Sequence, residues 1–589
     1  GDILDVNPWI DGPSLSDVDG WNVSANGILS LSADNIGQLS QRVNIRSADI
    51  SNILATGEAF IAGAGMGSGD VSLGGGSATD GVFDLNMLSE NLIITGSIEA
   101  KAVSVIVDSG SLTLTDGISV VAYNDMDLIA QGDINLSSIQ TSDGVITIDA
   151  KAGRVLDNTN AEISNITVLS DEAVVNIFGI SIGEKDIVDG ENVSDIDLSI
   201  SKIGSMIAGS GGIYLDSART LDVGDVVTSG DLDVRITSGD LIFSSDQTVV
   251  SASLEVKQGS LRQVSGTTLE TTGVSGSANS GDLDINVMRD VTFSTMLVNS
   301  GNVTLVSELG SVLDGTLADT ASLENLVIHN GQLVEMSATQ IGTHYEGGDI
   351  NIDALDINSI TAFEGGIFIG LTGRDEALTI IDTLTAISEQ SDVLITSGAG
   401  MLQVNNANAS DNLSLRAAGE SGQDSLLVGT ARAGGNLALS STVGNITQIE
   451  NTDIIANSLG SVTELSSGGD VILVSATNDF DELSVDSSKN LSARDISNLK
   501  VFNINAVGNL SLTTAKQISL QDDTSITVGG DAVISVSTGS LIFGENHVTN
   551  VEGNLTADVF NGDWVAISSS TITVGKDIDT AVIGNVDLQ

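Results

Sequence analysis

The chain of 589 residues carries a net charge of −59, because 79 Asp and Glu residues outnumber 20 Lys and Arg residues. Such a field repels nucleic acid and anionic lipid headgroups, which argues against both as partners. The absence of Cys excludes disulfides, thiolate metal sites and thiol catalysis. Apolar residues make up 41% of the chain but aromatic residues only 3%. The core is therefore expected to consist mainly of stacked aliphatic side chains, with little room for large rings.

The first 30 residues differ in composition from the rest of the chain. They hold both prolines, Pro8 and Pro13, and two of the three tryptophans, Trp9 and Trp21. Proline removes a backbone donor and holds the chain extended, and Trp is a favoured anchor in interface pockets. We expect residues 1–30 to cap an open end of the fold or to dock on a neighbouring copy. Because the chain begins at Gly1 rather than Met, we also expect a processed or excised segment.

A short pattern then recurs through residues 31–160 and again through residues 207–555. It consists of Gly, then Asp, Asn or Ser, then an aliphatic–x–aliphatic triplet, as in GDVSL from Gly69, GDLDV from Gly230 and GNLSL from Gly508. Alternation with period two, opened by a turn, predicts a short strand with one buried face. The inward positions include Leu232, Val234, Leu283 and Ile285, and the outward or turn-capping positions include Asp231, Asp233, Asp282 and Asp284.

The spacing of these copies predicts the fold. Gly230 and Gly239 are nine residues apart, as are Gly301 and Gly310, and related copies return after about 20 residues. A coil of this size cannot bury its own aliphatic face, but coils stacked at about 4.8 Å form one continuous core. The sequence therefore predicts an all-β chain, a parallel β-helix or β-solenoid of roughly 25 to 30 coils, with atypical capping or interface segments at both ends. No apolar run reaches the roughly 18 residues of a membrane-spanning helix, so no membrane insertion is expected.

Two later regions depart from the pattern. Between residues 161 and 206 the glycine-led motif fades, although Val174–Ile182 is still typical of a strand, so we expect a decorated coil or a small insertion there. Residues 556–589 contain Phe560 and the third tryptophan, Trp564. Docking of the N-terminal segment on these residues of a neighbour would build a head-to-tail filament. An intramolecular cap is the alternative for both ends.

Carboxylate-rich turns offer the oxygen ligands that Ca²⁺ prefers. The candidate calcium ligands are Asp17, Asp19, Asp479, Asp481, Asp522 and Asp523. The glycine spacing after Asp17 and Asp19 does not fit an EF-hand loop, and no tandem calcium repeat is present. We therefore expect no cofactor, with bound Ca²⁺ as the alternative.

No group of residues predicts catalysis. The histidines His329, His344 and His547 have no neighbours at metal-ligand spacing, and the most enzyme-like cluster, His344, Tyr345 and Glu346, is interpreted as a turn before a strand. A polysaccharide-active β-helix would need convergent acids, aromatic platforms and basic residues. We expect a chain that is not an enzyme, with no catalytic or cofactor-binding residue.

Three phrases resemble a known family: GGDVILVSATNDFDELSV (residues 468–485), GNITQIENTDIIANSLGSVTELSSGGDVIL (444–473) and GNLSLTTAKQISL (508–520). They are similar to the β-strand repeats of large bacterial surface proteins related to filamentous haemagglutinin. The resemblance covers about three quarters of the chain, although no secretion domain or receptor-binding module of that family is recognisable. It implies a right-handed β-helix, exported to the cell surface and used for adhesion or for building a fibre.

The expected function is thus that of an extracellular structural or adhesive rod, a part of a surface fibre or matrix filament. Further copies of the chain or neighbouring surface proteins are the expected partners, together with a glycan or a cell-surface receptor. A calcium-dependent surface coat or lattice is the first alternative, and a polysaccharide-active β-helix enzyme is the second.

Overall fold

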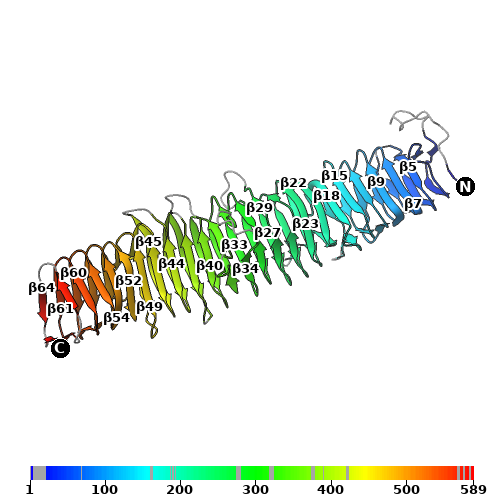
Figure 1. Ribbon diagram of the computed structural model, residues 1–589. Helices are drawn as coiled ribbons and strands as arrows, with labels where there is room; N and C mark the ends of the chain where they lie inside the picture. Colours follow the sequence, from blue (N-terminus) through cyan, green and yellow to red (C-terminus); the bar gives the residue numbers. More distant parts are fainter. Residues whose placement is uncertain are drawn as a thin grey trace. The chain divides into compact units, whose positions relative to one another are not determined.

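The structure, a computed structural model, describes residues 2–3, 21–67, 69–159, 163–185, 187–188, 191–192, 194–273, 280–316, 324–345, 347–372, 378–388, 390–398, 400–419, 423–566, 571–574, 578–582 and 586–588. The chain forms two compact units, Gly1–Arg289 (unit 1) and Asp290–Gln589 (unit 2). The described residues form β-strands and no helices. The strands run from β1 (Val23–Ser24) to β30 (Leu283–Val287) in unit 1 and from β31 (Val291–Phe293) to β65 (Val586–Leu588) in unit 2. The fold is all-β, as the sequence predicts (Figure 1).

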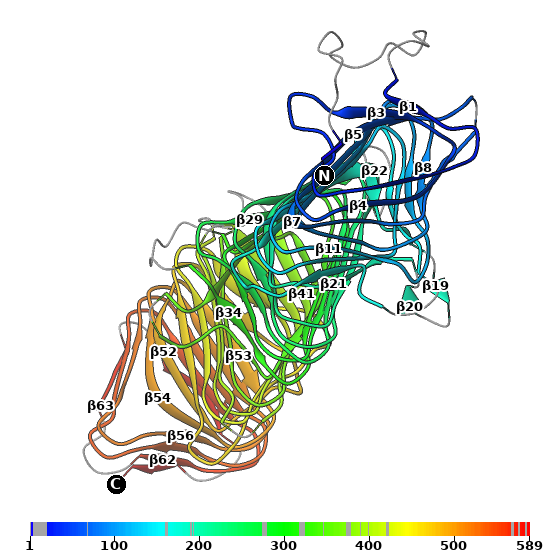
Figure 2. The same ribbon diagram turned by 90° about the vertical axis from the view of Figure 1, so that its right-hand side faces the viewer.

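In many coils three successive strands complete one turn, and a strand pairs in parallel with the strand three places further along. In unit 1 this relation joins β10 (Leu112–Leu114) to β13 (Ile134–Leu136), β11 (Ser119–Ala122) to β14 (Ser138–Thr141), and β12 (Met126–Ala130) to β15 (Val145–Ala150). Figure 2 shows such coils as loops stacked on one another. Parallel pairing between successive coils is the defining feature of a β-solenoid, so the predicted fold class is confirmed.

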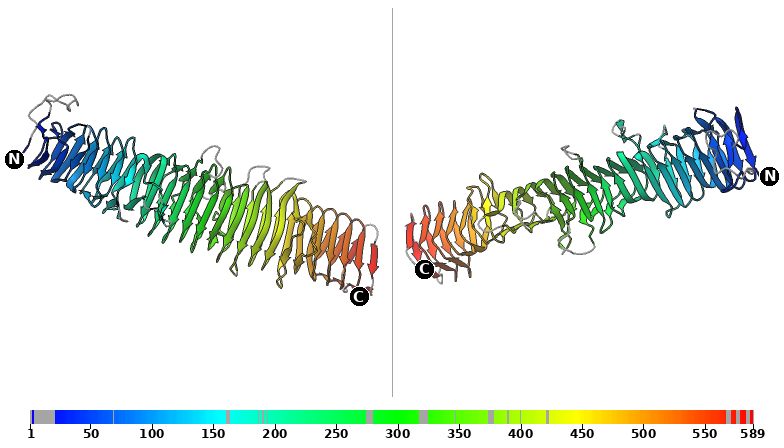
Figure 3. Two further views of the ribbon diagram at one scale, coloured as in Figure 1. Left: turned by 180° about the vertical axis from the view of Figure 1, so that it is seen from behind. Right: turned by 90° about the horizontal axis from the view of Figure 1, so that it is seen from above.

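In part of unit 2 two strands, one of them long, complete a coil, so each strand pairs with the strand two places further along. Here β39 (Asp356–Ala362), β41 (Leu378–Ala386), β43 (Met401–Ala409) and β45 (Asp424–Ala433) pair in parallel, each with the next of the four. Figure 3 shows strands lying side by side with colours that follow the sequence. Such neighbours share one register, so residues at equivalent positions form straight columns across the coils.

Coils are longer than the sequence spacing suggests. Equivalent residues are 19 to 25 residues apart along one column of unit 2, but the separation is 32 residues between Ile166 and Leu198 in unit 1 and 31 between Leu305 and Met336 in unit 2. The longer coils have more residues between their strands. The coils therefore number about 23 rather than 25 to 30.

The interior is built by the predicted alternation. Leu232, Val234, Leu283 and Ile285 are all at most 1% exposed, whereas Asp284 is exposed and Asp231, Asp233 and Asp282 are half-buried at the surface. The assigned inward and outward positions of these strands are confirmed. Burial raises the pKa of Asp233, and the nearby carboxylates of Glu255 and Asp231 raise this pKa further. Desolvation and like charges both disfavour the ionised carboxylate.

The core also holds aromatic rings, contrary to the expectation that it has little room for them. Phe83, Phe243, Phe293, Phe480 and Phe543 are among the largest fully buried side chains. Phe83 fits because a glycine faces it: a Cβ atom on Gly76 would lie 2.4 Å from the ring. A ring thus enters this narrow core where the neighbouring position has no side chain.

Residues 163–206 of unit 1 contain both solenoid strands and an addition to them. β17 (Ile166–Val168), β18 (Val174–Ile182), β21 (Ile196–Ser199) and β22 (Lys202–Ser217) all pair with neighbouring coils. Between β18 and β21, β19 (Ile187–Val188) and β20 (Glu191–Asn192) form a separate antiparallel pair, which projects from the side of the coils in Figure 2.

Candidate functional site

The second residue of the repeated motif forms a column of hydrogen bonds at a corner of unit 1. The Asn91 amide donates to Asp70 Oδ1, and the backbone N–H of Ser111 donates to Asn91 Oδ1, both at 2.8 Å. The backbone N–H of Asp133 donates to Ser111 Oγ at 3.0 Å, and that of Arg154 donates to Asp133 Oδ1 at 2.8 Å. We call this column, residues 70, 91, 111, 133 and 154, the unit 1 ladder.

Unit 2 contains a longer column of the same kind, the unit 2 ladder. Its members in order are Asn445, Asp470, Asn490, Asn509, Asp531 and Asn554. Four of its five bonds run from a backbone N–H to the side-chain oxygen of the preceding member, at 2.7–2.9 Å. The fifth runs from the Asn490 amide to Asp470 Oδ1 at 2.8 Å. Each coil is therefore bonded to the next at this corner as well as along its strands.

The two ladders explain why the motif takes Asp, Asn or Ser after Gly. These residues commonly bond their own turn backbone, but here the side-chain oxygen accepts from the following coil. Neither ladder places two carboxylates in adjacent coils, because amides or a hydroxyl separate them. These two corners thereby avoid stacking carboxylates at the coil spacing of about 4.8 Å.

A surface turn that is held by hydrogen bonds lies at another corner of unit 2, between β48 (Ile454–Ala456) and β49 (Val462–Ser467). The backbone N–H of Ser461 donates to Ser458 O at 2.9 Å, and Gly460 has a φ of 82°, a value that favours glycine. The Ser461 hydroxyl donates to Ala456 O at 2.8 Å, and Leu459 at the tip is 95% exposed.

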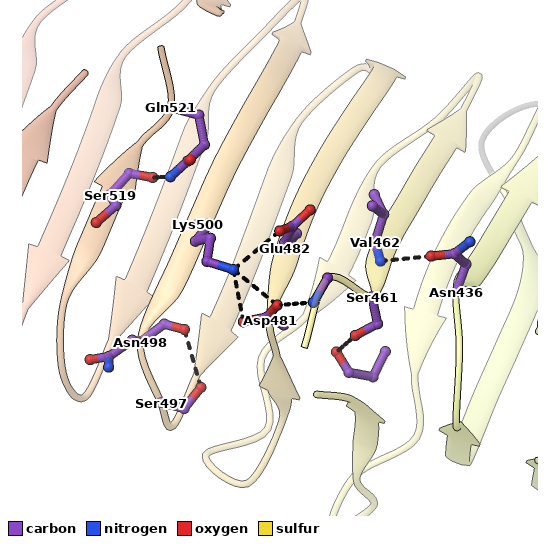
Figure 4. Close-up of polar contacts among 12 residues, drawn as sticks. Asn436, Ser461, Val462, Asp481, Glu482, Ser497, Asn498, Lys500, Ser519 and Gln521 are labelled. Carbon is purple, nitrogen blue, oxygen red and sulfur yellow. Dashed lines mark hydrogen bonds and ion pairs between the residues drawn. The ribbon is translucent and has the colours of Figure 1, made fainter. Parts of the chain in front are cut away.

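Acidic side chains of the next coil hold this turn (Figure 4). Asp481 Oδ2 accepts from the Gly460 N–H at 2.7 Å, and Asp479 Oδ2 accepts from the Asn457 amide at 2.6 Å. Lys500, one coil further, donates to Asp481 Oδ2 at 3.0 Å and to Glu482 Oε1 at 3.1 Å. The bond to Asp481 raises the pKa of Lys500. The cluster is therefore an internal ion-pair network that braces a turn.

The calcium candidates fall into three sets. Asp479 and Asp481 are engaged as just described, and Asp522 and Asp523 accept from the Glu545 N–H at 2.6 Å and the Asn546 amide at 2.9 Å. Asp17 and Asp19 lie outside the described residues. Within the described ranges no three His, Asp or Glu side chains are placed to hold a metal ion together.

The histidines are not brought together. The His344 ring lies 5.4 Å from that of Phe368, in a turn closed by a hydrogen bond from the Gly348 N–H to Tyr345 O; Glu346 lies outside the described residues. His547 is fully buried, with Nδ1 2.9 Å from Thr524 Oγ1 and Nε2 3.0 Å from Thr549 Oγ1. Burial lowers the pKa of His547.

The interface candidates are placed only in part. Pro8, Trp9 and Pro13 lie outside the described residues. Trp21 is half-buried, and Phe560 is 46% exposed at a corner. Trp564 belongs to β62 (Trp564–Ala566), which pairs with β59 (Leu541–Phe543) and β65, and β63 (Thr571–Val574) pairs with β60 (Val548–Val551). Docking between copies stays a prediction.

The sequence analysis did not predict a set of buried polar side chains that hydrogen-bond to one another or to the backbone, which we call braces. Asn478 and Gln448 form a reciprocal amide pair at 2.7 and 2.9 Å, and Asn478 is fully buried. Asp495, 1% exposed, accepts from the backbone of Phe480 and Ser497 at 2.8 Å. Burial raises the pKa of Asp495, and these two hydrogen bonds oppose that shift.

A matched pair of braces occurs once in each unit. Asn165 is fully buried and donates to Asp157 Oδ1 at 2.6 Å; Asn325 is fully buried and donates to Asp314 Oδ1 at 2.7 Å. The sequence carried a signal, since VLD followed by any residue and Thr occurs at residues 155–159 and 312–316.

In the described parts of the chain no helix is long and apolar enough to cross a membrane.

Comparisons of the chain with models of known protein families, with curated proteins and with solved structures return no match.

Proposed function

We propose that the chain is an extracellular structural or adhesive β-solenoid, a segment of a bacterial surface fibre or matrix filament related to the β-strand-repeat surface proteins. Its expected partners are further copies of itself or neighbouring surface proteins. The observation that carries the proposal is the unit 2 ladder, in which six successive motif positions are joined across coils.

The ladder supports a mechanical role because it adds a corner bond to each coil junction. A typical intramolecular hydrogen bond contributes about 1 kcal/mol, and the bonds act in series along a stack whose coils contact only their neighbours. The high negative charge supports the same role, since charged surfaces keep stacks of β-strands from pairing edge to edge. Residues 444–473 and 468–485, which carry the family resemblance, include the corner turn and the ladder positions Asn445 and Asp470.

Immunogold electron microscopy of intact source cells tests the proposal. An antibody raised against the purified chain is applied before and after the cells are made permeable. We expect label on filaments or matrix outside intact cells. Label that is found only after permeabilisation would place the chain inside the cell and contradict the proposal.

A further inference from the structure

One surface of unit 2 carries polar side chains that the fold does not use. Ser359 and Thr361 on β39 stand in register with Thr383 and Thr385 on β41. The next coils continue the first column with Asn406 on β43 and Thr430 on β45, and the second column with Asn408 on β43, after which it ends at the charged Arg432 on β45. We call Ser359, Thr361, Thr383, Thr385, Asn408 and Thr430 the neutral face.

These six side chains keep their hydrogen-bonding groups free. All are half-buried or exposed, and within the described part of the chain none of them has a hydrogen-bond partner. Asn406, in the same columns, donates to Asp382 O at 3.2 Å. Ser and Asn also occur in the two ladders, yet there their side-chain oxygens accept bonds from the next coil. The neutral face is thus available to a ligand.

An apolar ridge borders the neutral face. Phe363 and Ile387 directly follow Ala362 and Ala386, which pair in register, so the two side chains occupy the same corner in adjacent coils. They are 44% and 55% exposed. Hydroxyl and amide groups in rows beside an exposed ring are the groups that bind sugars, whose hydroxyls need hydrogen bonds and whose C–H faces pack on apolar surfaces.

The charges around the face are partly neutralised. Asp382 accepts from the Asn405 amide at 2.5 Å, and Arg432 lies 3.9 Å from Asp453, while Glu364 stays exposed beside Phe363. A chain with a net charge of −59 repels anionic polymers, so an uncharged ligand fits the six neutral side chains best.

We propose that the neutral face, with Phe363 and Ile387, binds an extended, uncharged β-linked polysaccharide. Coils repeat at about 4.8 Å, close to the length of one sugar residue in such a chain, so one sugar can meet each coil from β39 to β45. An ordered layer of water or ice is the competing occupant, but the projecting ridge does not suit a flat lattice. This inference goes beyond the proposed function and holds whether or not the chain builds a fibre.

Isothermal titration calorimetry of the full chain tests the proposal with cellohexaose, β-1,4-mannohexaose and laminarihexaose, and with an alginate hexamer as the anionic control. The triple variant Thr383→Val, Thr385→Val and Phe363→Ala removes two hydroxyls and the ring while keeping the β-branched shape on the strand. The matched control is Thr513→Val, Thr556→Val and Phe502→Ala, which makes the same changes on outward residues elsewhere in unit 2.

We expect at least one neutral hexamer to bind, with affinity at least tenfold lower for the triple variant and unchanged for the control. Equal melting temperatures of the two variants show that both are folded. Absence of binding by all neutral hexamers, or equal binding by the triple variant, would overturn the proposal. Ice shaping that the triple variant loses would overturn it in favour of ordered water.

Discussion

The unit 2 ladder and the neutral face are built from similar residues and use them in opposite ways. Asn509 in the ladder accepts the Asp531 N–H at 2.9 Å, whereas Asn408 in the neutral face is not engaged within the described residues. Both side chains are exposed. The difference lies in the partner within reach: at the corner the Asn509 oxygen meets a backbone N–H of the next coil, whereas the backbone around Asn408 pairs with the neighbouring strands β41 and β45. Residue type alone therefore does not define the role of a polar side chain in this fold.

The largest loss of stability is expected for a substitution in the buried interior. Replacing Ile285 by Asp puts an unpaired carboxylate into the stack, and we expect a loss of at least about 4 kcal/mol. Replacing the adjacent, exposed Asp284 by Asn should change stability by less than about 0.5 kcal/mol. Thermal melting followed by circular dichroism compares them, and similar shifts for the two variants would refute the assigned alternation.

The contrast between the two surfaces is tested by one substitution at two sites. Asn509→Ala removes a ladder acceptor, and we expect a loss of about 1 kcal/mol. Asn408→Ala on the neutral face removes no internal bond, so its effect should stay below about 0.5 kcal/mol. Urea unfolding of both variants gives the values. If Asn408→Ala were as costly as Asn509→Ala, the two surfaces would not differ as described.

The order of charges in the ladder predicts a smaller effect. Asn490→Asp keeps the acceptor for the Asn509 N–H but loses the amide donor and faces Asp470 with a second carboxylate. We expect a loss of about 0.5–1 kcal/mol at pH 7 that shrinks with salt and with acid. Asn436→Asp is the matched control, since Asn436 bonds Asn412 and Val462 and has no carboxylate beside it in its column. Equal salt dependence of the two variants would argue against charge ordering.

The smallest expected effect concerns acid. The folded pKa of His547 is lowered by burial, so the unfolded chain takes up the proton first, and stability falls as pH drops below the unfolded value of about 6.5. Between pH 7.5 and 6.0 this contributes a small loss of stability. The burial-raised pKa of Asp495 acts in the opposite sense at lower pH. Melting of His547→Asn should show less loss between these two pH values; an unchanged loss would show that His547 does not set this pH dependence.

The fold could be predicted because its signal is local. Alternation within GDLDV and the return of glycines place Leu232 and Val234 inside and Asp233 outside, and the structure confirms this. Coil length could not be predicted in the same way, because the extra residues of the longer coils contain no repeat motif. Phe83 in the core was missed since its space depends on Gly76, a position whose sequence context indicates only a turn.

The surface roles were predictable only in part. The motif identifies the corner positions of Asn509 and Asp531, but the partner of each side chain lies one coil away. The sequence of a single coil does not indicate its register with the next coil, so these partners could not be predicted. The carboxylates Asp479 and Asp481 were grouped correctly along the chain. Their partners, Asn457 and Lys500, come from the coils before and after, so the group braces a turn at the place where the sequence offers calcium ligands.

Hydrogen exchange at the Asp531 amide tests the central claim most directly. This amide donates to Asn509 Oδ1 in the unit 2 ladder. Exchange of the full chain and of Asn509→Ala, followed by mass spectrometry with fragmentation that resolves single amides, compares it with the Val533 amide in the adjoining strand β58 (Ala532–Val536). Loss of about 1 kcal/mol of local protection should accelerate exchange at Asp531 by roughly fivefold to tenfold and leave Val533 unchanged. Unaltered exchange at Asp531 would show that the side-chain ladder does not hold the coils together.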